Sequence, residues 1–310
     1  MPEKNEPLLL RPAGKDYLWG GTRLNDDFEK NIPLSPLAET WECSTHPDGP
    51  SFVVGGRFDG RPLAEVLEAN PGYLGVRHRG ETGLPILIKF IDAKKDLSVQ
   101  VHPGDDYARL HENGQLGKTE MWYVLDCEPD AFLYYGFDHE ISKAEFAERI
   151  QNHTLTEVLN TVPVHKGDSF FIPSGTLHAI GKGIVVAEVQ QSSNVTYRVY
   201  DYGRVGADGK PRALHVEKAL DVTRRTPPAK HDFGTHLAQC EYFTVDAKNG
   251  AFEGTADEKS FVSLLITDGE GTLTSGGETV NVKKGESYFL PAASGPYAVR
   301  GACQTLVTTV

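Results

Sequence analysis

The stretch VPVHKGDSFFIP, residues 162–173, occurs a second time in the chain as VNVKKGESYFLP, residues 280–291. Seven of the twelve positions are identical, and three others exchange Asp for Glu, Phe for Tyr and Ile for Leu. Each copy has a polar turn around Lys-Gly-acid and then an aromatic and apolar segment that ends at Pro. This pattern is typical of a hairpin that enters the edge of a sheet or the rim of a barrel. Because a repeat marks a repeated structural unit, the sequence predicts two related β modules.

A second, weaker match joins Tyr123–Asp126 (YVLD) to Leu265–Asp268 (LITD). These segments are 142 residues apart, whereas the copies of the first repeat are 118 apart, so the first module carries about 24 additional residues. The additional residues lie within 141–161, where S-x-x-E and T-x-x-E motifs that begin at Ser142 and Thr154 are typical of helix N-termini. The helices that we expect lie at 143–150 and 155–160 in this insertion, and elsewhere at 63–69 and 107–112.

The composition favours a mainly β protein. Of the 310 residues, 32 are Gly and 19 are Pro, about a sixth of the chain. This share is above the average of about 12% and favours many turns between short strands. The paired prolines of RTPPAKHD, residues 225–232, mark the best position for a linker. We place the boundary near residue 228, which gives an N-terminal module at 1–228 and a C-terminal module at 229–310.

Charge and apolar content exclude several classes of partner. Lys and Arg total 31 against 43 Asp and Glu, and the resulting net charge of −12 has the wrong sign for a general nucleic-acid binder. No apolar stretch approaches the ~18 residues of a membrane span, and Leu8–Leu10 is too short for the core of a signal peptide. The four cysteines are far apart and are expected to be buried thiols. We therefore expect a cytoplasmic monomer or homodimer that binds neither nucleic acid nor a membrane.

Two predicted strands carry side chains suited to a metal site. In LSVQVH, strict alternation places Gln100 and His102 on one face, opposite the three apolar residues. In GKTEMWYV, Lys118 and Glu120 share a face in the same way. A lone His on a strand is more often hydrogen-bonded than metal-bound, and a Lys–Glu pair two residues apart is commonly a solvated edge pair. The two strands alone leave both interpretations open.

The stretch GDSFFIPSGTLH, residues 167–178, resembles the second signature of the cupins, with the spacing G-x5-P-x-G-x2-H. The Pro ends a strand, and the Gly permits a tight turn that directs His178 toward the mouth of a barrel. The first cupin signature supplies two more His and a Glu. Here a Gln replaces the first His, so the resemblance assigns these positions to Gln100, His102 and Glu120. Two imidazoles, a carboxylate and an amide oxygen can enclose a divalent metal ion.

The second module lacks these ligands. After Pro291 the chain reads AASGP instead of SGTLH, and the weaker match pairs Glu120 with Val262. We therefore expect one metal ion per chain, in the first module, and a degenerate C-terminal cupin module without a metal site.

Six stretches together resemble the type I mannose-6-phosphate isomerases in their short bacterial form. In chain order they are KDYLWGGTRL, AETWECS, QVHP, GKTEMWYV, PSGTLHAIGKG and EVQQSSNVTYRVYDYGR. The resemblance covers essentially the whole chain and implies two cupin-type, jelly-roll β-barrels. In that family zinc is held by the Gln, His, Glu and His of these motifs, and an arginine is the proposed catalytic residue. The resemblance carries these roles to Gln100, His102, Glu120 and His178 for zinc, and to Arg198. The longer members insert a helical domain, of which the two short helices expected here are what remains.

The resemblance implies interconversion of mannose 6-phosphate and fructose 6-phosphate, in which a proton moves between C2 and C1 of the open-chain sugar through an enediol. Zinc would act as a Lewis acid on a sugar oxygen. Because the substrate is a dianion and the protein is acidic, we expect Lys118 and Arg198 to supply positive charge and to be catalytic, with Lys89 nearby. Glu188, Lys118, Lys89 and His102 all remain candidates for the proton carrier, since geometry identifies a base before its pKa does.

Two other functions are compatible with the residues. His102, Glu120 and His178 also form the two-His-one-carboxylate set of a non-haem iron dioxygenase. Gln100 argues against this alternative, because a fourth protein ligand occupies a position that oxygen chemistry needs. A cupin that binds a sugar without catalysis would keep the ligands but would not need Arg198. No helix-turn-helix pattern supports a regulator.

Overall fold

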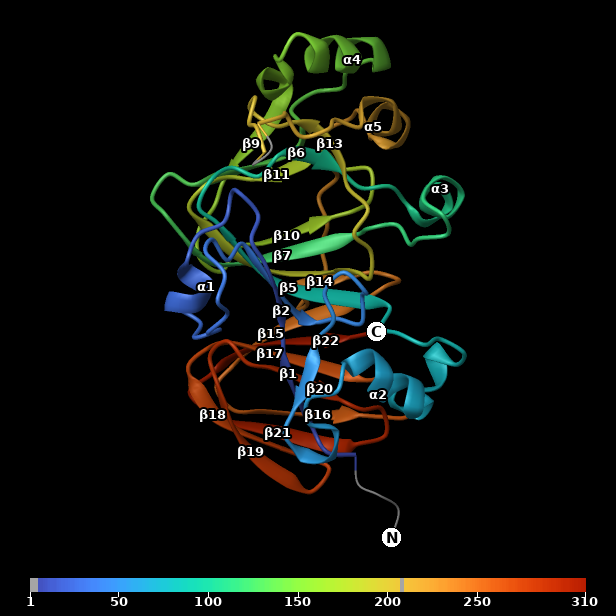
Figure 1. Ribbon diagram of the computed structural model, residues 1–310, viewed down its shortest axis with the longest axis vertical. Coiled ribbons are helices and arrows are strands. Elements are labelled where there is room, and N and C mark those ends of the chain that lie inside the picture. Colours follow the sequence, from blue (N-terminus) through green and yellow to red (C-terminus); the bar gives the residue numbers. More distant parts are fainter. Residues whose placement is uncertain (1–4, 207–208) are drawn as a thin grey trace.

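The strands of this chain form four antiparallel sheets that are stacked along the longest axis of the molecule (Figure 1). The computed structural model describes residues 5–206 and 209–310. A five-stranded and a six-stranded sheet lie in the upper half of the view, and a seven-stranded and a four-stranded sheet lie in the lower half. The prediction of a mainly β protein is confirmed.

The two upper sheets carry the site described below. In spatial order, the five-stranded sheet consists of β13 (Tyr197–Tyr200), β6 (Val99–Val101), β11 (His178–Ile180), β8 (Phe132–Phe137) and β9 (Leu159–Pro163). The six-stranded sheet consists of β10 (Ser169–Ile172), β7 (Glu120–Cys127), β12 (Ile184–Gln191), β5 (Ile86–Ala93), β3 (Glu39–Cys43) and β2 (Ala13–Lys15).

Of the two lower sheets, the seven-stranded sheet combines strands from both ends of the chain. The seven-stranded sheet consists of β14 (Ala238–Gln239), β15 (Thr244–Asn249), β22 (Gln304–Thr309), β17 (Val262–Asp268), β20 (Ser287–Leu290), β1 (Leu8–Arg11) and β4 (Phe52–Val54). The four-stranded sheet consists of β16 (Phe252–Ala256), β21 (Gly295–Gly301), β18 (Glu270–Ser275) and β19 (Glu278–Lys283). Strands from before and after residue 228 thus share one sheet.

Apolar side chains fill the spaces between successive sheets. The cluster between the six-stranded and five-stranded sheets includes Trp122, Val186, Leu133 and Ile180. Similar clusters lie between the six-stranded and seven-stranded sheets and between the seven-stranded and four-stranded sheets. A fourth cluster joins the outer face of the five-stranded sheet to two helices at the top of Figure 1, α4 (Lys143–Gln151) and α5 (Val216–Val222).

The other helices are short and lie at the margins of the sheets. They are α1 (Arg23–Asp26), α2 (Leu63–Ala69) and α3 (Asp105–His111), with 3-10 turns at Gly56–Phe58, Pro71–Leu74, Val76–His78 and Leu155–Val158. The predicted helix at 63–69 is confirmed, and the one at 107–112 begins two residues earlier than predicted. No helix in the described part of the chain is long and apolar enough to cross a membrane.

The repeated turn does not form the predicted hairpin in either copy. In the first copy, β9 belongs to the five-stranded sheet and β10 to the six-stranded sheet. In the second copy, β19 belongs to the four-stranded sheet and β20 to the seven-stranded sheet. Each turn therefore carries the chain from one sheet of a pair to the other. A polar turn reverses the chain direction, but long-range pairing decides which sheet the next strand joins.

One of the two helices predicted in the insertion is confirmed. The hydroxyl of Ser142 accepts a hydrogen bond from the backbone N–H of Glu145 and begins α4 as the capping motif predicts. The second helix, predicted at 155–160, is wrong. Thr154 makes no such cap, and a single 3-10 turn ends at Val158, where β9 begins its pairing with β8. Pairing with a neighbouring strand here overrides the local helix signal.

Candidate active site

A polar cavity of about 290 Å³ lies between the five-stranded and six-stranded sheets, beside their shared apolar cluster. Both sheets contribute side chains to its wall. The lining residues are Tyr17, Trp19, Glu39, Lys89, Ile91, Leu97, Ser98, Gln100, Lys118, Trp122, His178, Ile180, Glu188, Asn194, Thr196, Arg198 and Arg212. Trp19 and Trp122 belong to the apolar cluster and also line the cavity.

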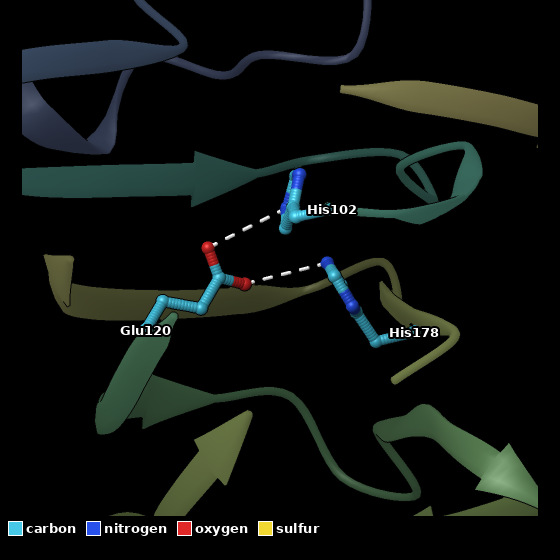
Figure 2. A group of neighbouring side chains, drawn as sticks. All are labelled: His102, Glu120 and His178. Atoms are coloured by element: carbon cyan, nitrogen blue, oxygen red, sulfur yellow. Dashed lines mark ion pairs between the residues drawn. The ribbon is translucent and has the colours of Figure 1, made fainter. Parts of the chain in front are cut away.

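Three predicted metal ligands converge beside this cavity, and one of them, His178, lines it. His102 follows β6, Glu120 begins β7 and His178 begins β11, so two of them come from one sheet and the carboxylate from the other. All three are buried. Figure 2 shows that the two oxygens of Glu120 point to different histidines: Oε2 lies 3.6 Å from His102 Nε2, and Oε1 lies 3.3 Å from His178 Nε2. The ligand atoms lie within 4.8 Å of one another, close enough to share one ion.

The turn of the PSGTLH motif positions His178 and joins it to His102. Gly175 has a φ of +84°, and a Cβ atom at this position would lie 2.8 Å from the carbonyl oxygen of Val222. Both facts favour glycine there. The backbone N–H of Gly175 donates a hydrogen bond to the carbonyl of His102 at 2.8 Å, so the turn ties the two histidine-bearing segments together.

Hydrogen bonds fix the tautomer of both imidazoles. The Nδ1 atom of His102 lies 2.8 Å from the carbonyl oxygen of Val195, and that of His178 lies 2.9 Å from the carbonyl oxygen of Thr176. A carbonyl only accepts, so each Nδ1 carries the proton and each Nε2 presents a lone pair toward Glu120. Metal-binding histidines in proteins have this arrangement. Burial lowers the pKa of His178 to about 4 and that of His102 well below its usual value, which keeps both rings neutral.

The donor atoms of this group fit a metal ion. Both carboxylate oxygens of Glu120 and the Nε2 atom of His178 are buried acceptors. Oε2 of Glu120 is ion-paired with Lys118, whereas Oε1 of Glu120 and Nε2 of His178 have no hydrogen-bond donor among the described residues. Burial, together with the nearby charge of Glu188, raises the pKa of Glu120. Unsatisfied buried acceptors are costly, and a divalent cation would satisfy both of them. Two neutral imidazoles and a carboxylate are a common donor set for zinc.

Charged residues form a row across the six-stranded sheet beside these ligands. Lys89 is paired with Trp41 on one side and with Glu188 on the other, and Glu188 is paired with Trp122. Directly opposite residues in a sheet point to the same face. Lys89 Nζ accordingly lies 3.4 Å from Glu188 Oε1 and 3.5 Å from Glu39 Oε2. The indole N–H of Trp122 donates to Glu188 Oε2 at 2.8 Å.

Lys118 connects this row to the metal ligands. Its Nζ lies 2.5 Å from Glu120 Oε2, 3.2 Å from His102 Nε2 and 3.7 Å from Glu188 Oε1. Although burial opposes ionisation of Glu188, the charges of Lys118 and Lys89 lower its pKa, so this carboxylate stays ionised.

The buried cluster therefore contains three carboxylates and two ammonium groups. The carboxylates belong to Glu39, Glu120 and Glu188, and the ammonium groups to Lys89 and Lys118. With both imidazoles neutral, the cluster has one more carboxylate than ammonium group. Such an excess suits a divalent cation, because the cation would leave the cavity positive toward an anionic ligand.

Gln100 and Arg198 face the same cavity from the five-stranded sheet. In the register of this sheet, Gln100 lies opposite His178 on one side and opposite Arg198 on the other. The Oε1 atom of Gln100 lies 3.5 Å from the hydroxyl of Ser98. The strand that carries Arg198 has a register shift between Arg198 and Tyr200, so the alternation of side chains is broken immediately after the arginine.

Around the second copy of the repeat, a valine occupies the position that corresponds to Glu120. Glu120 is paired with Ile172 between β7 and β10, and Val262 is paired with Leu290 between β17 and β20. Ile172 and Leu290 are matching positions of the repeat, so the register of the sheets puts Val262 where the first module has Glu120. Among the described residues, only His102, Glu120 and His178 form a group of His, Cys, Asp and Glu residues suited to hold a metal.

Three further polar residues of the cavity had no predicted role. Glu39 lies in AETWECS, where the carboxylate accepts a hydrogen bond from Trp41 Nε1 at 2.8 Å. Tyr17 and Arg212 reach the cavity from loops, and Arg212 is held by Asp201. The only available signal for Tyr17 and Glu39 was the resemblance of KDYLWGGTRL and AETWECS to the family motifs, and Arg212 lies outside both stretches.

The sequence and the fold of this chain are both similar to those of known proteins. The phosphomannose isomerase type I catalytic domain matches residues 8–124, and the cupin domain of mannose-6-phosphate isomerase matches residues 234–310. Mannose-6-phosphate isomerase ManA of Bacillus subtilis is 40% identical, over 98% of this chain and 98% of its own. The crystal structure of the mannose 6-phosphate isomerase from Bacillus subtilis has a TM-score of 0.90 at 36% identity, and covers 98% of this chain and 99% of that chain. A crystal structure of mannose 6-phosphate isomerase bound with zinc and yttrium shares the fold, with a TM-score of 0.76 at 19% identity over 97% of this chain and 98% of that chain.

Proposed function

This chain belongs to the type I mannose-6-phosphate isomerases, and from this premise we propose that the cavity between its two upper sheets interconverts mannose 6-phosphate and fructose 6-phosphate. The observation that carries the proposal is the convergence of His102, Glu120 and His178 on one point beside a cavity that His178, Lys118 and Arg198 line. A dioxygenase or a non-catalytic sugar-binding cupin is not favoured, because the relatives over the whole chain are isomerases.

We propose that the metal is zinc and that Gln100, His102, Glu120 and His178 hold it. Glu120 and His178 supply the unsatisfied buried acceptors, and the Nδ1 hydrogen bonds aim the imidazoles. Gln100 is included because it lies opposite His178 in the sheet and faces the same cavity. When bound, zinc polarises a sugar oxygen and stabilises the negative charge of the enediolate.

Lys118 and Arg198 are the residues that we propose as catalytic. Both line the cavity, from opposite sheets, so the substrate would lie between two cations. Their positive charges offset the phosphate and the developing enediolate in a protein whose net charge is −12. A desolvated cavity strengthens such interactions relative to those in water.

The proton transfer is assigned to the cluster of Glu188, Lys118 and Lys89. The proton leaves C2 of the open-chain aldose for this cluster while the electron pair moves toward the C1 oxygen. The C1 oxygen takes up a proton, the C2 hydroxyl gives one up, and the proton held by the cluster is returned to C1, which completes the ketose with no net gain or loss of protons. His102 is removed from the candidates, because its Nδ1–H is bound to the carbonyl of Val195 and its Nε2 is assigned to the metal.

The arrangement of the four sheets suggests how the chain is divided into two modules. We propose that each pair of sheets is a cupin jelly-roll unit, because the repeated turn crosses between the two sheets in both units. The N-terminal module, 1–228, contains every proposed ligand and catalytic residue, and β1 and β4 extend the sheet of the degenerate module, 229–310. We further propose a cytoplasmic monomer or homodimer that does not bind nucleic acid.

The function is tested by a coupled assay for fructose 6-phosphate formed from mannose 6-phosphate, with metal analysis of the same preparation. We expect turnover that depends on bound zinc. Oxygen uptake by an iron-loaded protein would support the dioxygenase instead. Sugar binding without turnover by the zinc-loaded protein would support the non-catalytic alternative.

One zinc ion should bind per chain, and it should bind in the N-terminal module. The physical reason is that Val262 in the second module offers no ligand where the first has Glu120. Elemental analysis after dialysis, normalised to protein concentration, measures the stoichiometry. Two tightly held equivalents of zinc per chain would contradict this prediction.

A further inference from the structure

We propose that His215 is a positioning residue for Arg198, whose guanidinium it aims into the cavity by holding the backbone of the arginine. His215 does not line the cavity, and among the described residues it makes no contact with a proposed metal ligand. It lies on the other side of β13 and lines an outer cavity of about 670 Å³. The proposal rests on the catalytic role proposed above for Arg198.

Both backbone groups of Arg198 are bound by the same residue. The N–H of Arg198 donates to Nδ1 of His215 at 3.2 Å, and the backbone N–H of His215 donates to the carbonyl of Arg198 at 2.8 Å. The side chain is fixed at two further points, since its Nε donates to the hydroxyl of Ser98 at 3.1 Å and its Nη1 to the carbonyl of Ala213 at 3.2 Å. A guanidinium has five N–H donors, so donors remain for a ligand.

The place of Arg198 in the sheet explains why it needs this support. β13 is an edge strand that is paired only with β6. The backbone N–H and C=O of Arg198 that bond to His215 point away from β6. They therefore form no hydrogen bond within the sheet. The register also shifts immediately after Arg198. An edge strand with a bulge fixes the direction of a side chain only when other contacts hold it.

The imidazole must be neutral to make its contact. A backbone N–H only donates, so Nδ1 of His215 accepts and the ring proton lies on Nε2. Burial, and then the positive charges of Arg198 and Lys218, lower the pKa of His215, which favours the neutral ring. Glu112 acts in the opposite direction, and its carboxylate is bound by Lys218 and by the hydroxyl of Tyr197.

His215 is itself held by a rigid element. It is the residue before α5, whose Ala219 and Leu220 are buried against the outer face of the five-stranded sheet. Because α5 is packed against this sheet, it fixes the position of His215. His215 and the carbonyl of Ala213 in turn hold Arg198 through hydrogen bonds. A well-oriented group can lose roughly a hundredfold in rate when it is displaced by about 1 Å.

The test replaces the imidazole and leaves the backbone bond. His215→Phe keeps a ring but has no acceptor, and should lose roughly tenfold or more in kcat and in kcat/KM, as expected for a misdirected catalytic group. His215→Asn places an amide oxygen close to the position of Nδ1, and should retain at least about half of the wild-type kcat because the acceptor is restored. His165→Ala, at an exposed histidine in the turn between β9 and β10, should behave as the wild type. Zinc content and melting temperature are measured for each variant.

A double-mutant cycle separates positioning from a general structural role. If His215 acts through Arg198, His215→Phe should have almost no further effect on kcat when Arg198 is already Lys. An equal loss in both backgrounds, or a normal kcat for His215→Phe, would overturn the proposal. So would equal losses in His215→Phe and His215→Asn. The outcome for Arg198→Lys alone decides the separate question of whether Arg198 is catalytic, so the two failures can be told apart.

Discussion

His178→Ala should yield a folded protein that has lost zinc and activity together. Removing one of the proposed ligands leaves an incomplete shell around the ion. Partners that merely orient a metal ligand are worth roughly 10- to 100-fold in affinity, so loss of a ligand itself should weaken zinc binding by more than about a hundredfold. Without its Lewis acid, which supplies several kcal/mol, the enzyme should lose at least about a thousandfold in kcat. Metal analysis and the coupled assay are carried out on the same sample.

The fold should survive this substitution. Among the residues that the structure describes, the Nε2 atom of His178 has no hydrogen-bond partner, and its Nδ1–H has one, the carbonyl of Thr176. The direct loss is therefore a single hydrogen bond, worth about 1 kcal/mol, together with the packing of one ring. His139→Ala is a matched control, because that side chain is exposed and pairs only with the adjacent Asp138. A His178→Ala protein with normal zinc content and normal activity would show that His178 is not a ligand.

The residues of the candidate metal site could be singled out because their sequence signals are local. The turn that directs His178 is contained in five residues, and the alternation of LSVQVH places Gln100 and His102 on one face. The weaker match also predicted that Val262 corresponds to Glu120, and the register agrees, since Glu120 lies opposite Ile172 and Val262 opposite Leu290. Alternation misplaced one residue, since Leu97 packs in the cluster beside the cavity and not with Val99 and Val101 on the outer face.

The remaining features depend on contacts between distant parts of the chain. The row of Trp41, Lys89, Glu188 and Trp122 exists because three separate strand pairs bring it into register. The sequence offered Lys89 and Glu188 as candidates but gave no reason to place them 3.4 Å apart. The thiols of Cys127 and Cys240 are only partly buried, in contrast to the prediction, because the depth of a strand end is likewise set by its neighbours.

Arg198→Lys should keep zinc and the fold but lose at least roughly a hundredfold in kcat, the size expected when one oriented donor to a developing oxyanion is removed. The lysine retains the positive charge. It cannot reproduce the contacts with the hydroxyl of Ser98 and the carbonyl of Ala213 while it also faces the cavity, because an ammonium is a compact point charge and not a planar fork. Arg61→Lys, at an exposed arginine that precedes α2 and pairs with Glu65, provides the matched control.

The kinetic signature of Arg198→Lys distinguishes two roles for the arginine. A contact with the phosphate that is equal in ground and transition states would raise KM and leave kcat nearly unchanged, whereas a contact with the enediolate would lower kcat and kcat/KM together. The second result is expected, because Arg198 lies opposite Gln100 in the sheet and so projects beside the proposed metal ligands.

Arg212 lines the same cavity, and burial together with the charge of Arg212 lowers the pKa of Arg198. A second cation is thus present to offset the phosphate while Arg198 serves the reacting oxygens. A zinc-loaded Arg198→Lys protein with near-normal kcat would remove the arginine from the catalytic residues and leave it a structural cation.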